Sequence, residues 1–443
     1  MKTELSGHYD YGRIVKAMAP MILMMIVISV YSIVDGLFIS NYAGSDAFAG
    51  MNLIWPPIAL VAAIGLMIGT GGSALVAKTF GEGDAEKANR IFSMLVRLTI
   101  ISGTIMAVVL FIIMPWLAKV LGADEAMMPH AILYGRILII VLPAYMLQMG
   151  FHPFFMVAER PEIGTKLSLA CGVINMALDA LFVAVFGWGL TGAAIASSLG
   201  LLLGGTFPLW FFGSKRNKTQ LRLVKCKSDW SSIAKSCTNG MSEFVGSIAM
   251  NITIICYNWQ LMRFIGSNGV SAFGIVWYLG FIFSAVFIGY NMGISQVISF
   301  NYGAGNKEEL RSLLRKSILL LAITGLGITV LAETLSPVLS RIFVGYDAEL
   351  CDLATHATRI YMISFLFCGF NMFASAWFTA LNNGVISAVA SFVRTLVFEL
   401  GAVFILPIIL GIEGIWLAVN VAEALTLVLS AALIIGFRSR YGY

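Results

Sequence analysis

The stretch GSDAFAGMNLIW (residues 44–55) returns in the second half of the chain as GSNGVSAFGIVW (residues 266–277), a shift of 222 residues. The same shift sets FGEGDAEK (80–87) on YGAGNKEE (302–309), and it pairs Gly192 with Gly414. One offset that holds through three separated regions indicates an internal duplication. The sequence therefore predicts a fold built from two similar halves.

The composition is that of an integral membrane protein. Of 443 residues, 59% are hydrophobic and 12% are charged, and the mean hydropathy is +0.89. A soluble globular chain has about 25% charged residues. Apolar runs of about 20 residues cross a bilayer as helices, because a lipid-exposed strand leaves backbone groups without hydrogen bonds. Twelve such runs are predicted, at residues 14–40, 52–76, 91–114, 131–158, 164–186, 190–212, 232–261, 271–298, 312–336, 357–381, 386–409 and 413–436.

The duplication and the twelve runs together predict an all-α integral membrane protein with two pseudo-symmetric six-helix lobes. Six is an even number, so both halves enter the membrane with the same orientation. We expect an N-terminal lobe at residues 1–212, a linker at 213–230 and a C-terminal lobe at 231–443.

Lysine and arginine predict the orientation. Placing both termini and the even-numbered loops on one side puts 22 of the 28 basic residues there, Lys2 among them. Basic loops stay in the cytoplasm. We therefore expect a multi-pass protein of the plasma (cytoplasmic, or cell inner) membrane with both termini cytoplasmic. The net charge of +5 reflects this bias and gives no reason to expect nucleic acid as a partner.

The chemistry-bearing residues argue against an enzyme. The cysteines form no CxxC pair, and the four histidines have no HExxH spacing. Neither a nucleophile with its base nor a metal constellation is found, so no catalytic residue and no cofactor is predicted. Two lobes meeting at a central cavity suit a secondary transporter. A channel stays as an alternative, although no ring of repeated charge or carbonyl filter motif is present.

Two acids inside the apolar runs are short and cannot reach the membrane surface: Asp35 and Asp179, with Asn175 one helical turn before the latter. A carboxylate in hydrocarbon is costly unless a partner neutralises it. Two carboxylates and an amide oxygen suit a proton or Na⁺. A protonated, hydrogen-bonded packing cluster is the alternative. Glu333, Glu399 and Glu423 are interpreted as interfacial or helix-packing residues.

Several motifs together resemble the multidrug and toxic compound extrusion (MATE) family over essentially the whole chain. They are Pro20 with YSIVDGLFIS (31–40), GTGGSALVAKTFGEGDAEKANR (69–90), NMALDALF (175–182) and GISQVISFNYGAGN (293–306). The resemblance implies a V-shaped pair of six-helix lobes. It also implies a monomer in the lipid bilayer that exports organic cations or amphipathic compounds in exchange for Na⁺ or H⁺.

The resemblance also implies a site. Asp35, Asn175 and Asp179 match the family's N-lobe cation site, where Na⁺ is a candidate ligand, and Ser197 stands where threonine is often found. Tyr31 matches a residue that lines the same cavity.

The second lobe departs from some family members. Asn251 lies near a place where these members have an acid in span seven, and span ten contains no acid. Glu243, Asn251 and Arg394 are weaker candidates for the substrate cavity, and Glu243 is equally well interpreted as a charge at a helix start. A related flippase for lipid-linked saccharides is a further alternative, but few buried basic residues other than Arg394 are visible.

Overall fold

The computed structural model describes the backbone of residues 4–42, 45–345 and 347–443, which form helices joined by turns and short loops, without a strand. Lys2, one of the residues that orient the chain, lies outside the described residues. The first half forms α1 (Tyr11–Tyr42), α2 (Ser45–Gly81), α3 (Ala85–Val120), α4 (Met127–Ile140), α5 (Leu142–Val157), α6 (Pro161–Asp179), the π-helix η1 (Ala180–Val185) and α7 (Gly189–Gly213). The second half forms α8 (Trp230–Asn239), α9 (Met241–Phe264), α10 (Ser267–Gly303), α11 (Lys307–Val344), α12 (Ala348–Met362), α13 (Phe365–Ala380), α14 (Gly384–Phe392), the π-helix η2 (Val393–Glu399), α15 (Leu400–Leu410) and α16 (Ile412–Tyr441).

The helices account for the predicted membrane spans. Among the described residues, nine helical stretches are long and apolar enough to cross a membrane. Three helix pairs meet the combined requirement of length and apolarity only together: α4 with α5, α8 with α9, and α12 with α13. Counting each pair as one span brings the number to twelve, as the sequence predicts.

The three pairs are bent by 58°, 42° and 49°, whereas the sequence predicts continuous helices there. Pro143 lies in the first turn of α5, where its missing N–H removes no helical hydrogen bond. At Gly240, between α8 and α9, a β-carbon would collide with the backbone of Met67 in α2. Nothing in the sequence near Ile363 explains the third bend.

The helix bounds repeat with the same offset as the sequence motifs. Helix α2 covers residues 45–81 and α10 covers 267–303, so both ends are separated by 222 residues. Helices α3 and α11 begin at Ala85 and Lys307, which are the same distance apart. The duplication is therefore also visible in the residues at which these helices begin and at which α2 and α10 end.

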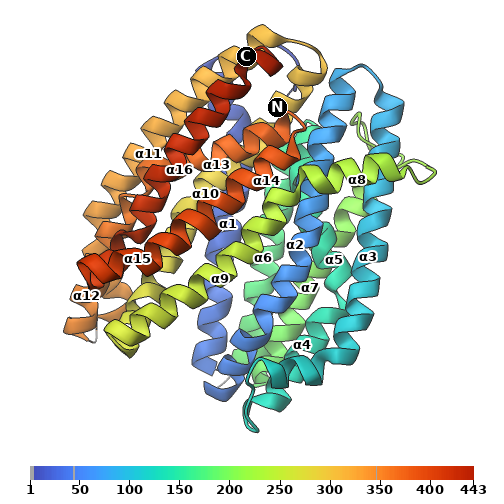
Figure 1. Cartoon of the computed structure of the whole chain (residues 1–443). Helices are drawn as coiled ribbons and strands as arrows, with labels where there is room; N and C mark the ends of the chain where they lie inside the picture. Colours follow the sequence, from blue (N-terminus) through green and yellow to red (C-terminus); the bar gives the residue numbers. More distant parts are fainter. Residues whose placement is uncertain (1–3, 43–44, 346) are drawn as a thin grey trace.

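The two halves form bundles that meet near the chain ends (Figure 1). The ends labelled N and C lie at the same end of the molecule, and the helices of the second half slant away from those of the first toward the opposite end. Across this junction α1 and α2 pack against α10, and α2 also packs against α8 and α9. We call α1 to α7 the first lobe and α8 to α16 the second lobe.

A GxxxG sequence on α10 makes the junction tight. A β-carbon at Gly289 would lie 2.5 Å from Cα of Ile22, and one at Gly293 would lie 2.6 Å from Sδ of Met18. Small residues one turn apart let helix backbones approach closely in membranes. These two glycines therefore set the distance between the lobes at α1.

The segment before α1, residues 4–10, ties the lobes together at the same end. Leu5 donates its backbone N–H to Oε1 of Glu159 in the first lobe at 3.0 Å. Glu309 of α11 accepts from the backbone N–H of Tyr9 at 2.9 Å and contacts Nδ1 of His8 at 2.7 Å. Lys316 of α11 donates to the carbonyl of Tyr9. Burial raises the pKa of Tyr9 to about 12, so its hydroxyl stays protonated and donates to the carbonyl of Glu4.

The glycine contact predicts how a single methyl group affects the lobe junction. Gly289→Ala inserts a carbon against the α1 backbone, and overpacking of this kind costs about 1–3 kcal/mol. We expect the variant to unfold at a lower temperature than the parent protein in detergent. Gly274→Ala on the same helix is the matched control, because its β-carbon meets nothing within 4 Å. Equal unfolding temperatures for the two variants would contradict the close approach.

Candidate functional site in the first lobe

Three helices of the first lobe bring the predicted polar residues together. Helix α1 carries Asp35, α6 carries Asn175 and Asp179, and α7 carries Ser197. The Ser197 hydroxyl donates to Oδ1 of Asp35 at 3.4 Å, and Nδ2 of Asn175 donates to Oγ of Ser197 at 3.3 Å. The carboxyl groups of Asp35 and Asp179 lie next to each other. All four side chains therefore belong to one cluster, which we call the aspartate cluster.

The aspartate cluster has more acceptors than donors. Asp179 is fully buried and Asn175 is 5% exposed. Both carboxylate oxygens of Asp179 and Oδ1 of Asn175 have no hydrogen-bond partner among the described residues. A buried polar atom without a partner costs about 1–3 kcal/mol, and more when it is charged. A proton on a carboxyl group, or a small cation between the oxygens, is the kind of partner that such acceptors can bind.

The local sequence explains how the three helices come so close. At Gly172 on α6 a β-carbon would lie 3.1 Å from Cδ1 of Tyr31, so the glycine lets the Tyr31 ring pack on α6. At Gly200 on α7 a β-carbon would lie 3.7 Å from Cβ of Asn175, in ordinary contact. Directly after Asp179 the helix changes to the π form, in η1. Such segments are rare and are frequently found at functional sites.

The weaker candidates lie in different places. Tyr31 is one turn before Asp35 on α1 and packs against Gly172. Glu243 lies in the first turn of α9, where a helix N-terminus favours an acid. Asn251 lies on the same helix and donates to the carbonyl of Ser247. Among the described residues, neither Glu243 nor Asn251 makes a hydrogen bond or an ion pair with the aspartate cluster.

Arg394 belongs to a second buried network, which the sequence analysis missed. Its Nη2 donates to Oε1 of Glu423 at 2.6 Å, and its Nε donates to the same oxygen at 2.9 Å. Oε2 of Glu423 accepts from Asn371 at 2.6 Å, and Oδ1 of Asn371 accepts from Ser430 at 3.0 Å. The side chains of Arg394 and Glu423 are 24% and 6% exposed. The sequence does contain a hint of this ion pair: Arg394 lies in predicted span eleven and Glu423 in predicted span twelve.

No group of three or more His, Cys, Asp or Glu side chains that could hold a metal ion is found among the described residues. The acidic side chains of the aspartate cluster are Asp35 and Asp179, and the amide of Asn175 and the hydroxyl of Ser197 add two further oxygens. Carboxylate, amide and hydroxyl oxygens are ligands for a hard cation, and the carboxylates also bind protons.

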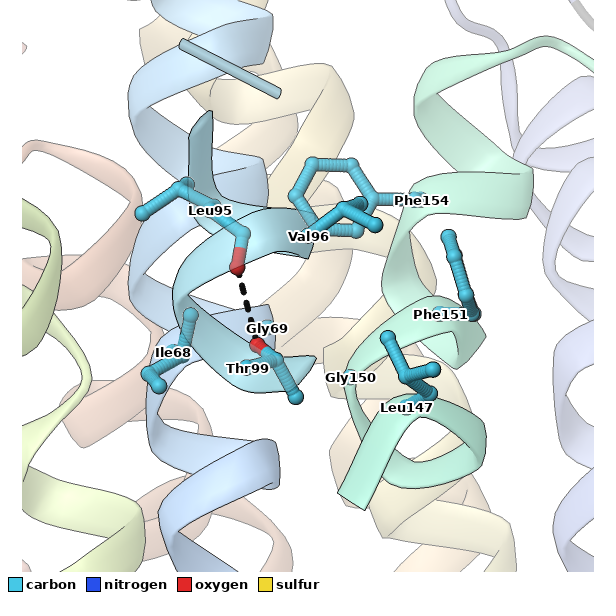
Figure 2. Close-up of a pocket in the computed structure, with 9 residues that line it drawn as sticks. All are labelled: Ile68, Gly69, Leu95, Val96, Thr99, Leu147, Gly150, Phe151 and Phe154. Carbon is cyan, nitrogen blue, oxygen red and sulfur yellow. Dashed lines mark hydrogen bonds between the residues drawn. The ribbon is translucent and has the colours of Figure 1, made fainter. Parts of the chain in front are cut away.

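A small hollow in the first lobe is apolar and lies apart from the aspartate cluster. Figure 2 shows it between α2, α3 and α5, where the only dashed line is the bond from the Thr99 hydroxyl to the Leu95 carbonyl. The hollow measures about 10 Å³, about the limit for one water molecule. It is lined by Ile68, Gly69, Leu95, Val96, Thr99, Leu147, Gly150, Phe151 and Phe154. It is a packing gap and does not hold a drug-sized compound.

Known proteins resemble this chain over its full length. The multidrug export protein MepA of Staphylococcus haemolyticus (strain JCSC1435) is 21% identical over 444 residues, covering 99% of this chain and 97% of the relative. A crystal structure of a MATE protein in complex with MaL6 has a TM-score of 0.92 at 21% identity, covering 99% of this chain and 97% of that chain. A structure described as the outward-facing conformation of a multidrug resistance MATE family transporter of the MOP superfamily has a TM-score of 0.91 at 22% identity, with the same coverage.

These likenesses confirm the predicted fold class of twelve helices in two lobes. The family model MatE matches the chain twice, at residues 20–181 and at residues 244–405, once in each half. The two matches together cover well over half of the chain, and they agree with the internal duplication. The chain belongs to the MatE family, whose members are membrane transporters.

Proposed function

We propose that this chain exports cationic or amphipathic organic compounds in exchange for Na⁺ or H⁺, and that the aspartate cluster binds the coupling ion. The observation that carries the proposal is the excess of buried acceptor oxygens on Asp179 and Asn175. The substrate class is supported by the relatives, one of which is named a multidrug export protein.

The cluster couples ion and substrate through its charge. With no ion bound, Asp35 and Asp179 repel each other and attract positive charge. Binding of H⁺ or Na⁺ removes the repulsion and satisfies the oxygens of Asp179. A ligand shifts a conformational equilibrium only by its differential affinity for the two states. The coupling ion and an organic cation that favour opposite states therefore weaken each other's binding.

The remaining residues have supporting roles in this proposal. Ser197 and Asn175 orient the Asp35 carboxylate through their chain of hydrogen bonds. Asn175 supplies an additional oxygen ligand if the ion is Na⁺. Tyr31 offers an aromatic face to a cationic compound beside Asp35. Glu243 and Asn251 line the path on the second lobe. Arg394 is neutralised by Glu423 and holds α16 against η2.

The setting of the protein is part of the proposal. We place it in the plasma membrane as a monomer, with both termini cytoplasmic because of the basic loops. Residues 1–212 and 231–443 act as rigid lobes, and residues 213–230 connect them. The GxxxG contact between α10 and α1 then closes the cytoplasmic side in this conformation.

The alternatives are separated by one transport measurement. A channel dissipates gradients, whereas an antiporter in proteoliposomes exchanges a labelled organic cation for Na⁺ or H⁺ in both directions. A flippase for lipid-linked saccharides would show no exchange of the labelled organic cation for Na⁺ or H⁺. The ion pair between Arg394 and Glu423 supports the exporter, because it leaves no free buried guanidinium there for an anionic headgroup.

The first prediction concerns the two aspartates. Asp35→Asn and Asp179→Asn should each reduce drug efflux from cells to the level of cells without the protein, because the cluster of either variant can no longer bind and release the coupling ion. The double variant should show no further loss, since the two carboxylates act as a unit. Glu86→Gln, which neutralises an acid on the exposed first turn of α3, is the control and should leave efflux unchanged. Normal efflux by both single variants, with normal amounts in the membrane, would assign the pair to packing.

The second prediction identifies the ion. Drug affinity of the purified protein should fall by about 5–150-fold as the coupling ion saturates. It is measured at fixed pH over a Na⁺ series and at fixed Na⁺ over a pH series. Asn175→Ala should weaken the Na⁺ effect, since it removes an oxygen ligand, but should leave an effect of H⁺ nearly intact.

Ser198→Ala, next to the cluster on α7, is the matched control because the Ser198 hydroxyl has no partner among the described residues. A drug affinity that is independent of both ions would end the antiport proposal. Dependence on pH alone would assign the site to protons.

A further inference from the structure

A basic cavity lies between α11 and α16 of the second lobe, at the end of the molecule where both chain ends lie (Figure 1). It measures about 200 Å³, far more than one water molecule needs. It is lined by Arg311, Leu314, Arg315, Ile434, Ile435, Arg438 and Tyr443. Three guanidinium groups from two helices therefore face one space, and no acidic side chain is among the lining residues.

The three arginines have no acidic side chain as a partner among the described residues. Arg311 donates to the carbonyl of Gly442 at 3.1 Å, and Arg438 donates to the main-chain oxygen of Tyr443, the last residue of the sequence, at 3.0 Å. Arg315 makes no hydrogen bond or ion pair within the described structure. Each guanidinium has five donors, so most of them remain free. Three like charges around one cavity repel each other, and an anion relieves that repulsion.

Apart from Tyr443, the rest of the wall is apolar and continues along an exposed apolar surface of α11 and α16. Leu314, Ile434 and Ile435 lie beside the arginines. Ile435 is 71% exposed, and Val428, two turns further along the same face of α16, is 69% exposed. On α11, Ile318 and Leu319 follow Arg315 by one turn and are also exposed. A ligand with an anionic head and a long apolar tail could place its head at the arginines and its tail along the exposed apolar residues.

We propose that this cavity binds the phosphate headgroup of an anionic phospholipid, whose acyl chain lies along α11 and α16. Arginine recognises phosphate through paired, charge-assisted hydrogen bonds. Basic pockets between transmembrane helices at the membrane surface are typical sites for anionic headgroups. A free phosphate would use the arginines but would leave the isoleucines exposed, so the structure favours a lipid. The proposal does not depend on which compound the protein transports.

The test measures lipid retention by the full-length protein. Protein purified in detergent is mixed with equal amounts of phosphatidylglycerol and phosphatidylcholine, and native mass spectrometry counts the bound lipids. The parent protein should retain phosphatidylglycerol preferentially. Each arginine changed to glutamine should weaken retention by about five-fold, so the triple variant loses on the order of 100-fold. Arg315→Gln is the safest single change, because it removes no hydrogen bond that the structure shows.

The matched control removes the same charge elsewhere on the same side of the molecule: Lys215→Gln, Arg216→Gln and Lys218→Gln in the linker. The site is supported if the control variant still retains phosphatidylglycerol while the cavity variants lose it. Equal loss in both sets would mean general attraction to basic residues and would overturn it. Displacement of phosphatidylglycerol by inorganic phosphate at equal concentration would assign the cavity to a soluble anion, which also overturns the lipid proposal.

Discussion

Hydrocarbon does not solvate charge, and this constraint governs both lobes. A charged side chain inside a membrane must be paired, protonated or bound to an ion. The second lobe uses pairing, with two hydrogen bonds from Arg394 to one oxygen of Glu423 and a third from Asn371 to the other. The first lobe leaves the oxygens of Asp179 without donors. One lobe thus contains a buried ion pair, whereas the other contains two buried carboxyl groups with more acceptor oxygens than donors.

The duplication makes this difference between the lobes visible. In the 222-residue repeat, Asp35 of the first lobe is equivalent to Tyr257 of the second, and Gly172 is equivalent to Arg394. In the first lobe the glycine makes room for Tyr31 beside the acid. In the second lobe the same position carries the arginine, and the acid has become a buried tyrosine. Each lobe also has one π-helical segment, η1 after Asp179 and η2 around Arg394 and Glu399. The two halves therefore share their helices but differ in which of these positions carries a charged side chain.

Much of the fold could be predicted from the sequence, because span length and repeat offset are properties of the chain itself. The members of the aspartate cluster could be named for a similar reason: isolated acids in apolar runs are few. The bends could not be predicted, since the one at Gly240 depends on how closely α2 approaches. The network of Arg394 was missed because its partners Glu423 and Asn371 come from spans twelve and ten. Their meeting depends on tertiary packing that no single span reveals.

If the lobes separate during transport, as the proposed function requires, the segment at residues 4–10 slows that separation. It is bonded to Glu159 in one lobe and to Glu309 and Lys316 in the other. Any rotation that parts the lobes at this end must first break one of these two attachments. A hydrogen bond to a charged group contributes about 1.5–3 kcal/mol, which corresponds to a roughly 10- to 150-fold slower opening if the bond is lost in the transition state. Under the proposed function, this short segment therefore contributes to the activation barrier for separating the lobes.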